Sequence, residues 1–327
     1  MRIAGAATAS LQCLLLRSLV VPRGSVALWL TLLTFTALTG TPALDRPGAH
    51  IDLAQWARLF RAPLVTTQAH AAGAERFQES QRRLLQAQIA RLAPPAQGTT
   101  NIYALGVAGW ADQDVFLKEL DGGLAVLGGI FPLNGRTLRL VNNRATRARL
   151  PVADRTNFTA AVHAIAEVMN REQDVLLLFL TSHGGPTGFA LRLPSAAISE
   201  LTPREVKATL DEERIKNRLV IVSACFAGIF VRPLANDNTI VLTAADARST
   251  SFGCAPERDW TYFGDAFFRY GLRRGRDLQA AFDNARVMIR GWELMDRAPP
   301  SNPQGYFGPA LTAKLAPFFA ESAGAQH

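Results

Sequence analysis

The chain has few of the residues that mark metal centres, disulfide-rich domains or phosphate-binding sites. Its 327 residues include 3 cysteines and 5 histidines, and no Cys-x-x-Cys or His-x-x-x-His spacing occurs. We therefore expect no metal site. No glycine-rich loop follows a predicted strand in the context that phosphate binding requires, and we expect no cofactor. Internal repeats and low-complexity segments are also absent.

Basic residues are numerous, but they form no long tract. The formal net charge is +8, and the arginines are scattered, with only short clusters such as Arg273-Arg274. A nucleic-acid-binding surface would instead concentrate basic residues on one face or in one tract. The pattern favours an evenly basic, solvated surface, and we predict no nucleic-acid partner. With 48% hydrophobic residues, the chain can bury a substantial core in one large domain or two small ones.

The N-terminal region has the features of a targeting segment. Three arginines precede an uncharged stretch from Gly24 to Leu44, whose most apolar part is Val26 to Leu38. That part has signal-peptide length, while the whole stretch, at a rise of ~1.5 Å per residue, is just long enough to span a bilayer. We assign residues 1–44 to a signal peptide or a signal anchor. The rest is predicted to be exported, either anchored in the inner membrane facing the periplasm or periplasmic after cleavage.

Two different patterns of apolar residues follow this segment. From Ile51 to Leu92, apolar residues recur at three- and four-residue spacing, which is typical of amphipathic helices. We predict a helical stalk or packing segment over residues 45–98. Between residues 99 and 320, short apolar runs alternate with amphipathic patterns. This alternation predicts an α/β domain in which helices cover both faces of a parallel sheet.

The expected strands cover residues 101–108, 137–143, 175–182, 218–224 and 239–245, and the expected helices cover residues 112–127, 157–170 and 203–216, with two more between 259 and 296. Thr156 or Asn157 is expected to cap the helix that precedes the third strand.

Two of these strands end on residues that carry chemistry. The run "VLLLFLTSHGGPTG" brings His183 to its tip, and "RLVIVSACFAG" ends on Cys225. Ligands of open parallel sheets bind outside the carboxyl ends of the strands. Strands that end roughly 40 residues apart can be immediate neighbours, because one βαβ unit needs about 30 residues or more. We predict that His183 and Cys225 emerge side by side at one edge of the sheet.

A cysteine and a histidine at one edge can perform nucleophilic catalysis. The imidazole stabilises the thiolate and later protonates the leaving amine. Backbone amides of Gly184 and Cys225 can form an oxyanion hole. The alternative is a structural cysteine and an incidental histidine, because two cysteines in an oxidising compartment, here Cys225 and Cys254, are by default a disulfide.

Four segments in order resemble a known family. They are "FLTSHGGPTGFAL", "IVSACFAG", "LTAADARSTSFGC" and "DWTYFGDAFF". Together they are similar to the legumain (asparaginyl endopeptidase) family of cysteine peptidases, in the clan of caspases and gingipains, over about residues 101–270. The resemblance implies a caspase-like α/β/α sandwich with a mostly parallel sheet. It also implies a peptide or protein substrate; the oligomeric state stays open. Arg-rich, Lys-poor usage and the N-terminal segment predict a bacterial, membrane-associated member.

The resemblance assigns roles to individual residues. Cys225 corresponds to the nucleophile and His183 to the general acid/base, with the amides of Gly184 and Cys225 in the oxyanion hole. In "AGWADQD", Asp112 aligns with the asparagine that supports the catalytic histidine. Asp114 falls where the family has a pocket arginine. Asp112 can alternatively serve as the cap of the helix that follows it.

The resemblance also concerns the specificity pocket. Asp265 in "YFGD" matches an acidic pocket residue; the alternative is an aspartate that interacts favourably with the dipole at a helix N-terminus. Ser223 stands where the family has a pocket glutamate, and we take it as a substrate-binding position. Because the arginine and the glutamate are both missing, asparagine specificity is in doubt, and a pocket with Asp265 can accept a basic residue instead.

Three functions fit the sequence. The first is a cysteine-type endopeptidase that hydrolyses peptide bonds through a Cys225 acyl-enzyme. The second is a transpeptidase or transamidase with the same acyl-enzyme and an amine as acceptor. The third is a non-catalytic envelope protein in which Cys225 and Cys254 form a disulfide.

Overall fold

The computed structural model describes residues 72–193, 197–274 and 277–324. The predicted targeting segment, residues 1–44, lies outside them. Residues from Glu79 onward form one compact unit; residues 15–78 form a second, of which only 72–78 are described, as part of a helix over residues 72–89. Within the described ranges, none of the helices combines the length and apolar character needed to cross a membrane.

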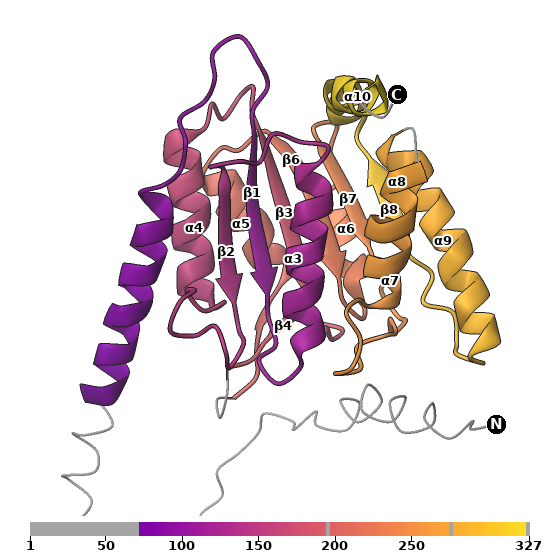
Figure 1. Ribbon diagram of the computed structural model, residues 1–327, viewed down its shortest axis with the longest axis horizontal. Helices are drawn as coiled ribbons and strands as arrows, with labels where there is room; N and C mark the ends of the chain where they lie inside the picture. The colour runs from indigo at the N-terminus through magenta and orange to yellow at the C-terminus, as the bar shows by residue number, and fades with distance from the viewer. Residues whose placement is uncertain (1–71, 194–196, 275–276, 325–327) are drawn as a thin grey trace, which may run out of the picture. The chain divides into compact units, whose positions relative to one another are not determined.

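The compact unit is built on a six-stranded sheet with the order β2-β1-β3-β6-β7-β8 (Figure 1). The first five strands in this order run parallel, and only β8 is antiparallel to its neighbour. The strands are β1 (Ile102–Ala108), β2 (Thr137–Val141), β3 (Val175–Thr181), β6 (Asn217–Ser223), β7 (Thr239–Thr243) and β8 (Gln304–Phe307). A short antiparallel pair, β4 (Phe189–Leu191) and β5 (Ser199–Leu201), follows β3.

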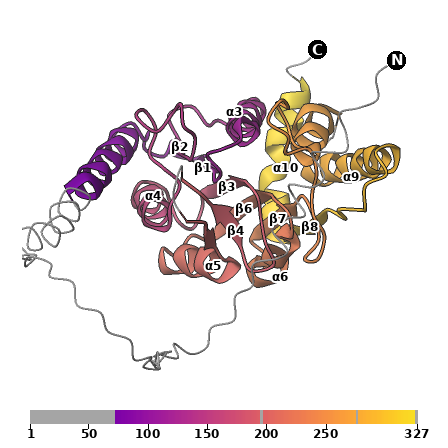
Figure 2. The same ribbon diagram turned by 90° about the horizontal axis from the view of Figure 1, so that it is seen from below.

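Helices cover both faces of the sheet, as the view from below shows (Figure 2). On one face lie α3 (Asp114–Gly128), α7 (Tyr262–Gly264), α8 (Leu272–Arg274), α9 (Leu278–Met295) and α10 (Pro309–Gly324), with a π-helical stretch, Asp265–Gly271, between α7 and α8. On the other face lie α4 (Arg155–Val168), α5 (Pro203–Glu212) and α6 (Val231–Leu234). The predicted α/β/α sandwich with a mostly parallel sheet is therefore confirmed.

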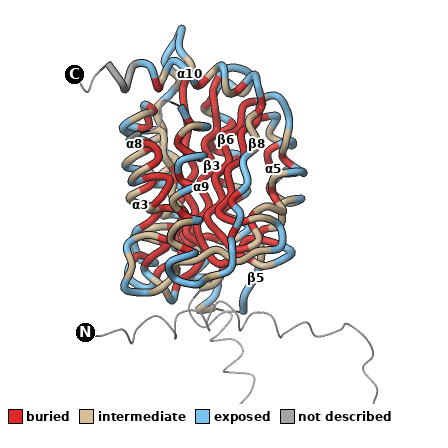
Figure 3. Tube along the Cα trace, turned by 90° about the vertical axis from the view of Figure 1, so that its right-hand side faces the viewer, coloured by how far each residue is buried: buried red, intermediate tan, exposed pale blue. Residues whose placement is uncertain are grey.

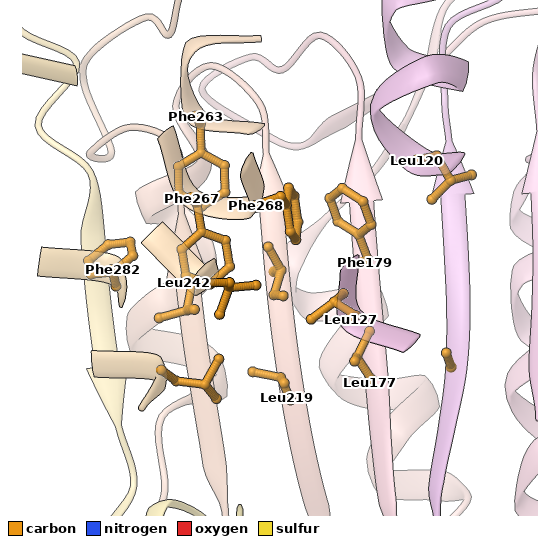
Figure 4. Close-up of a cluster of buried hydrophobic side chains, with 14 of the residues drawn as sticks. Leu120, Leu127, Leu177, Phe179, Leu219, Leu242, Phe263, Phe267, Phe268 and Phe282 are labelled. Atoms are coloured by element: carbon orange, nitrogen blue, oxygen red, sulfur yellow. The ribbon is translucent and has the colours of Figure 1, made fainter. Parts of the chain in front are cut away.

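The core is double because every central strand is buried on both sides. All seven residues of each of β1, β3 and β6 are buried, and Figure 3 shows β3 and β6 in the buried centre of the unit. On the α3 face, Phe179 packs against Phe268, and the Phe263 ring stacks on Phe267 (Figure 4). Burial of one such phenylalanine side chain stabilises the folded state by about 1.5–3 kcal/mol relative to leaving it exposed. These two layers hold the carboxyl ends of β3 and β6 in place.

The segment before β1 protects one edge of the sheet. The Gln88 side-chain amide accepts a hydrogen bond from Arg139 N and donates one to Arg139 O, both on the edge strand β2. Leu85 is buried in the core on the α4 side. An unpaired strand edge can pair with other chains. Gln88 occupies the backbone N–H and C=O groups of one residue on that edge.

Sequence and structure agree on the five parallel strands and differ in detail. The residue that caps α4 is Asp154, whose side chain accepts from Asn157 N. The prediction of Thr156 or Asn157 was therefore wrong, because the helix begins two residues earlier. The strands β4, β5 and β8 and the helix α10 were not predicted. Of β8, no residue is fully buried, so it lacks the apolar run by which the other strands were recognised.

Candidate active site

The ends of β3 and β6 place His183 and Cys225 at one edge of the sheet. The two strands are direct neighbours in parallel register, and Thr181, the last residue of β3, pairs with Ser223, the last of β6. His183 and Cys225 each follow this pair by two residues. A Cβ atom on residue 184 would lie 2.2 Å from the Cys225 carbonyl oxygen, so only glycine fits there. The two residues therefore follow the carboxyl ends of neighbouring strands, as predicted.

His183 lies in an aromatic pocket and is 8% exposed. Its ring contacts Trp110 edge-on at 4.6 Å and Phe116 at 5.1 Å between centroids. Burial, and secondarily the positive charge of Arg192, lowers the pKa of His183 to about 4. The imidazole is therefore neutral near pH 7, as a general base must be.

Gln113 fixes the imidazole. Its side-chain oxygen is hydrogen-bonded to His183 Nε2, while its side-chain nitrogen donates to the Cys254 carbonyl oxygen at 2.7 Å. The second bond sets the orientation of the amide, so that an oxygen faces the ring. An amide oxygen can only accept, and we infer that Nε2 carries the proton. Nδ1 is then the basic nitrogen.

Asp112 does not support the histidine as we predicted. Its carboxylate forms ion pairs with Arg144 at 2.7 Å and with Arg192 at 3.2 Å. The place predicted for Asp112 beside the imidazole is occupied by the next residue, Gln113. The carboxylate of Asp114 accepts a hydrogen bond from the Asn143 side chain at 2.7 Å.

Cys225 begins a tight turn that the loop after β7 covers. Its Sγ accepts a hydrogen bond from Ser251 N at 3.3 Å and lies 3.6 Å from both the hydroxyl and the carbonyl oxygen of Ser251. The next residue, Phe226, has φ +57° and bonds through its N–H to Ser249 O at 2.8 Å. Ser251 was not identified from the sequence.

Within the described part of the chain, Cys225 and Cys254 are not joined by a disulfide. The Cys254 carbonyl oxygen instead accepts the hydrogen bond from Gln113.

The two predicted pocket residues have partners within the protein. Asp265 is ion-paired with Arg269 at 3.1 Å, one helical turn away. Ser223 is buried, and its hydroxyl lies 3.2 Å from the Thr261 hydroxyl. In this structure Ser223 thus faces the interior below the strand ends.

Among the described residues, one group could supply three metal ligands: His163, Glu167 and Glu213, whose ligand atoms lie within 4.8 Å of one another. Arg171 forms ion pairs with both glutamates. The group includes neither His183 nor Cys225, and a guanidinium already supplies the positive charge there.

A sulfur and an imidazole at neighbouring carboxyl ends of a parallel sheet are the groups that nucleophilic catalysis by a cysteine needs. Residues 154–308 match the model of the Peptidase C13 family, the legumain family. The match confirms the resemblance over the part that contains His183, Cys225 and Asp265; Gln113 precedes it. No curated protein matches the chain. Caspase-1 from Spodoptera frugiperda is a similar solved structure, with a TM-score of 0.44, 13% identity and coverage of 66% of this chain and 93% of that chain.

Proposed function

We propose that the chain is a cysteine endopeptidase that hydrolyses peptide bonds through an acyl-enzyme on Cys225. The main support is the paired register of β3 and β6, which brings His183 and Cys225 to one edge with a glycine in contact with the Cys225 carbonyl. The match of residues 154–308 to a peptidase family agrees with it.

In the first step, Cys225 Sγ attacks the scissile carbonyl carbon while its proton moves to His183 Nδ1. The imidazole can take this proton because its pKa, lowered to about 4 by burial, leaves it neutral at pH 7. Gln113 holds the Nε2–H in place. The carbonyl oxygen becomes an oxyanion, and the amides of Gly184 and Cys225 are proposed to stabilise it.

In the second step, the C–N bond breaks, and His183 Nδ1–H gives its proton to the leaving amine. The product is a thioester on Cys225. Water then attacks the thioester carbonyl, with His183 Nδ1 as general base, and the carboxylic acid and the thiol are released. An amine acceptor in place of water would give the transpeptidase reaction by the same steps.

The proposed specificity differs from that of asparaginyl endopeptidases. Ser223 stands where the family has its pocket glutamate, and it is buried with its hydroxyl 3.2 Å from the Thr261 hydroxyl. Arg269 already compensates the charge of Asp265. We infer that asparagine is not strongly selected at P1, and that a basic P1 residue would have to compete with Arg269 for the aspartate.

The decisive test is cleavage of a positional-scanning peptide library by the full chain beside Cys225→Ala, with Cys254→Ala as the matched control. We expect Cys225→Ala to abolish cleavage and Cys254→Ala to retain it, because the contact of Cys254 with Gln113 is made by its backbone carbonyl, which alanine keeps. Cleavage by Cys225→Ala at the wild-type rate would refute the proposal. Addition of an amine nucleophile, followed by mass spectrometry, separates transfer from hydrolysis.

A further inference from the structure

Below the two strand ends lies a buried carboxyl group that the mechanism does not use. Glu119, on α3, has no exposed surface. It accepts hydrogen bonds from the Thr181 hydroxyl at 2.9 Å and from Thr261 N at 2.8 Å. A fully buried acidic group is costly unless it is well bonded. Its retention here therefore calls for an explanation.

The contacts of Glu119 reach both strands that carry the proposed catalytic pair. Thr181 is the last residue of β3, two positions before His183. Ser223, the last residue of β6, has its hydroxyl 3.2 Å from the hydroxyl of Thr261, whose backbone N–H donates to Glu119. The group thus joins the tips of two neighbouring strands from below.

The same contacts hold the turn that starts α7. The Thr261 hydroxyl accepts from Gly264 N at 3.0 Å and so caps α7. A Cβ atom on residue 264 would lie 2.1 Å from the Glu119 carboxyl oxygen, so this backbone can approach only because it is glycine. The next residue, Asp265, is the predicted pocket aspartate.

Helix α3 connects this carboxyl group to the imidazole. Gln113, at the N-terminus of the helix, bonds to His183; Phe116 packs on the same ring; Glu119 bonds to Thr181. The three residues are spaced by three along the chain and face the same strand end, as neighbouring positions of one helix face do. The start of α3 therefore contacts both the end of β3, at Thr181, and His183 two residues beyond it.

Given the proposed function, we propose that Glu119 is the positioning residue for the reaction. It sets the spacing of the β3 and β6 tips, and through them the distance between His183 Nδ1 and Cys225 Sγ. It does not touch the substrate. Loss of its hydrogen bonds would let the tips shift, and displacements of about 1 Å can reduce the rate of an enzyme by ~100-fold.

The protonation state of Glu119 shapes the choice of variants. Burial raises the pKa of Glu119, against hydrogen bonds from Ser223, Thr261 and Thr181 that lower it. Glutamine, which cannot ionise, keeps an oxygen that can accept from Thr261 N, and its amide N–H can donate to the Thr181 hydroxyl oxygen once that hydroxyl turns its own proton away. Glu119→Gln can therefore preserve the geometry, whereas Glu119→Ala cannot.

Asp174 provides the matched control. It is also buried, and its carboxylate accepts from Asn101 N and Asn170 N at 2.9 and 2.8 Å. It directly precedes β3 and therefore lies at the amino ends of the strands, whereas the proposed site lies at their carboxyl ends. Asp174→Ala removes a comparable set of bonds without touching the strand tips.

The experiment measures two rates in the full chain: kcat for a cleaved peptide, and alkylation of Cys225 by iodoacetamide, followed by mass spectrometry. We expect Glu119→Ala to lower both rates roughly 10- to 100-fold with little change in KM, and Glu119→Gln to recover them to within about threefold. Asp174→Ala should leave both rates within about twofold of wild type at a temperature where it is folded.

Equal rates for Glu119→Ala and Asp174→Ala would overturn the proposal. If Glu119→Ala does not fold, Thr181→Val replaces it, because it removes only the β3 hydroxyl and keeps the side-chain shape; wild-type rates in this variant would also overturn it. If wild type cleaves no peptide, the peptidase proposal fails, and the alkylation rates still decide whether Glu119 positions Cys225.

Discussion

Gln113 gives the sharpest test of the proposed acid/base chemistry. Its side-chain oxygen is hydrogen-bonded to His183 Nε2, in a pocket that lowers the pKa of the imidazole to about 4. Gln113→Glu would place a carboxylate at this contact. An opposite charge at hydrogen-bond distance raises a pKa by about 1–3 units, which predicts a pKa between about 5 and 7 in the variant.

The effect on catalysis follows from the neutral fraction of His183. The base must be unprotonated, so kcat/KM falls as the pH drops through its pKa. For a variant pKa near 6, kcat/KM at pH 5 should be about tenfold lower than in wild type. At pH 8 His183 is neutral in both proteins, so its protonation should leave kcat/KM nearly unchanged. The assay is kcat/KM from pH 4 to 9 with a peptide that does not titrate in this range.

Asp112→Asn is the control, because Asp112 was the residue predicted from sequence to support the histidine. In the structure it pairs with Arg144 and Arg192 instead. Its removal leaves the positive charge of Arg192 uncompensated, and that charge disfavours protonation of His183. The acid limb, which is the fall of kcat/KM at low pH, should therefore move to lower pH or stay in place. An acid limb that is unmoved in Gln113→Glu, or that moves upward in Asp112→Asn, would refute the reasoning.

Two further predictions concern stability and the glycine turn. The pKa of His183 is about 4 in the folded chain, whereas an unperturbed histidine has a pKa of 6.5, so the unfolded chain binds the proton more readily. The free energy of unfolding should therefore fall by up to about 3 kcal/mol as the pH drops from 6.5 towards 4; urea titrations that show the same fall in His183→Gln would contradict it. Gly184→Ala should disrupt the site, since its Cβ would lie 2.2 Å from the Cys225 carbonyl oxygen, whereas at Gly291 in α9 nothing lies within 4 Å. Gly291→Ala should raise stability by about 0.5–1 kcal/mol with cleavage unchanged; equal activity of the two variants would show that the contact at residue 184 does not matter.

The strand tips could be predicted from the sequence because their signals are local. Continuous apolar runs indicated that β3 and β6 are buried on both faces, and the residues that end each run determined the proposed pair. The edge strand β8 has no fully buried residue, so its place depends on pairing with β7, which no local pattern encodes.

The contacts around the histidine could not be predicted from the sequence. "ADQD" offers three polar side chains in a row, and the backbone at the start of α3 decides which one faces His183. Gln113 is the extended residue that precedes the helix, and its side chain reaches the ring. Glu119 looks like an ordinary surface position of an amphipathic helix; only the approach of Thr261, more than a hundred residues later in the chain, buries it.

The in-register pairing of β3 and β6 limits how this protein can vary. One residue inserted into either strand would advance its tip by about 3.3 Å and turn the terminal side chain to the opposite face of the sheet. The imidazole and the sulfur would then no longer share an edge. The lengths of these two strands are therefore bound to change together or not at all, whereas the loops and helices between them are free to lengthen.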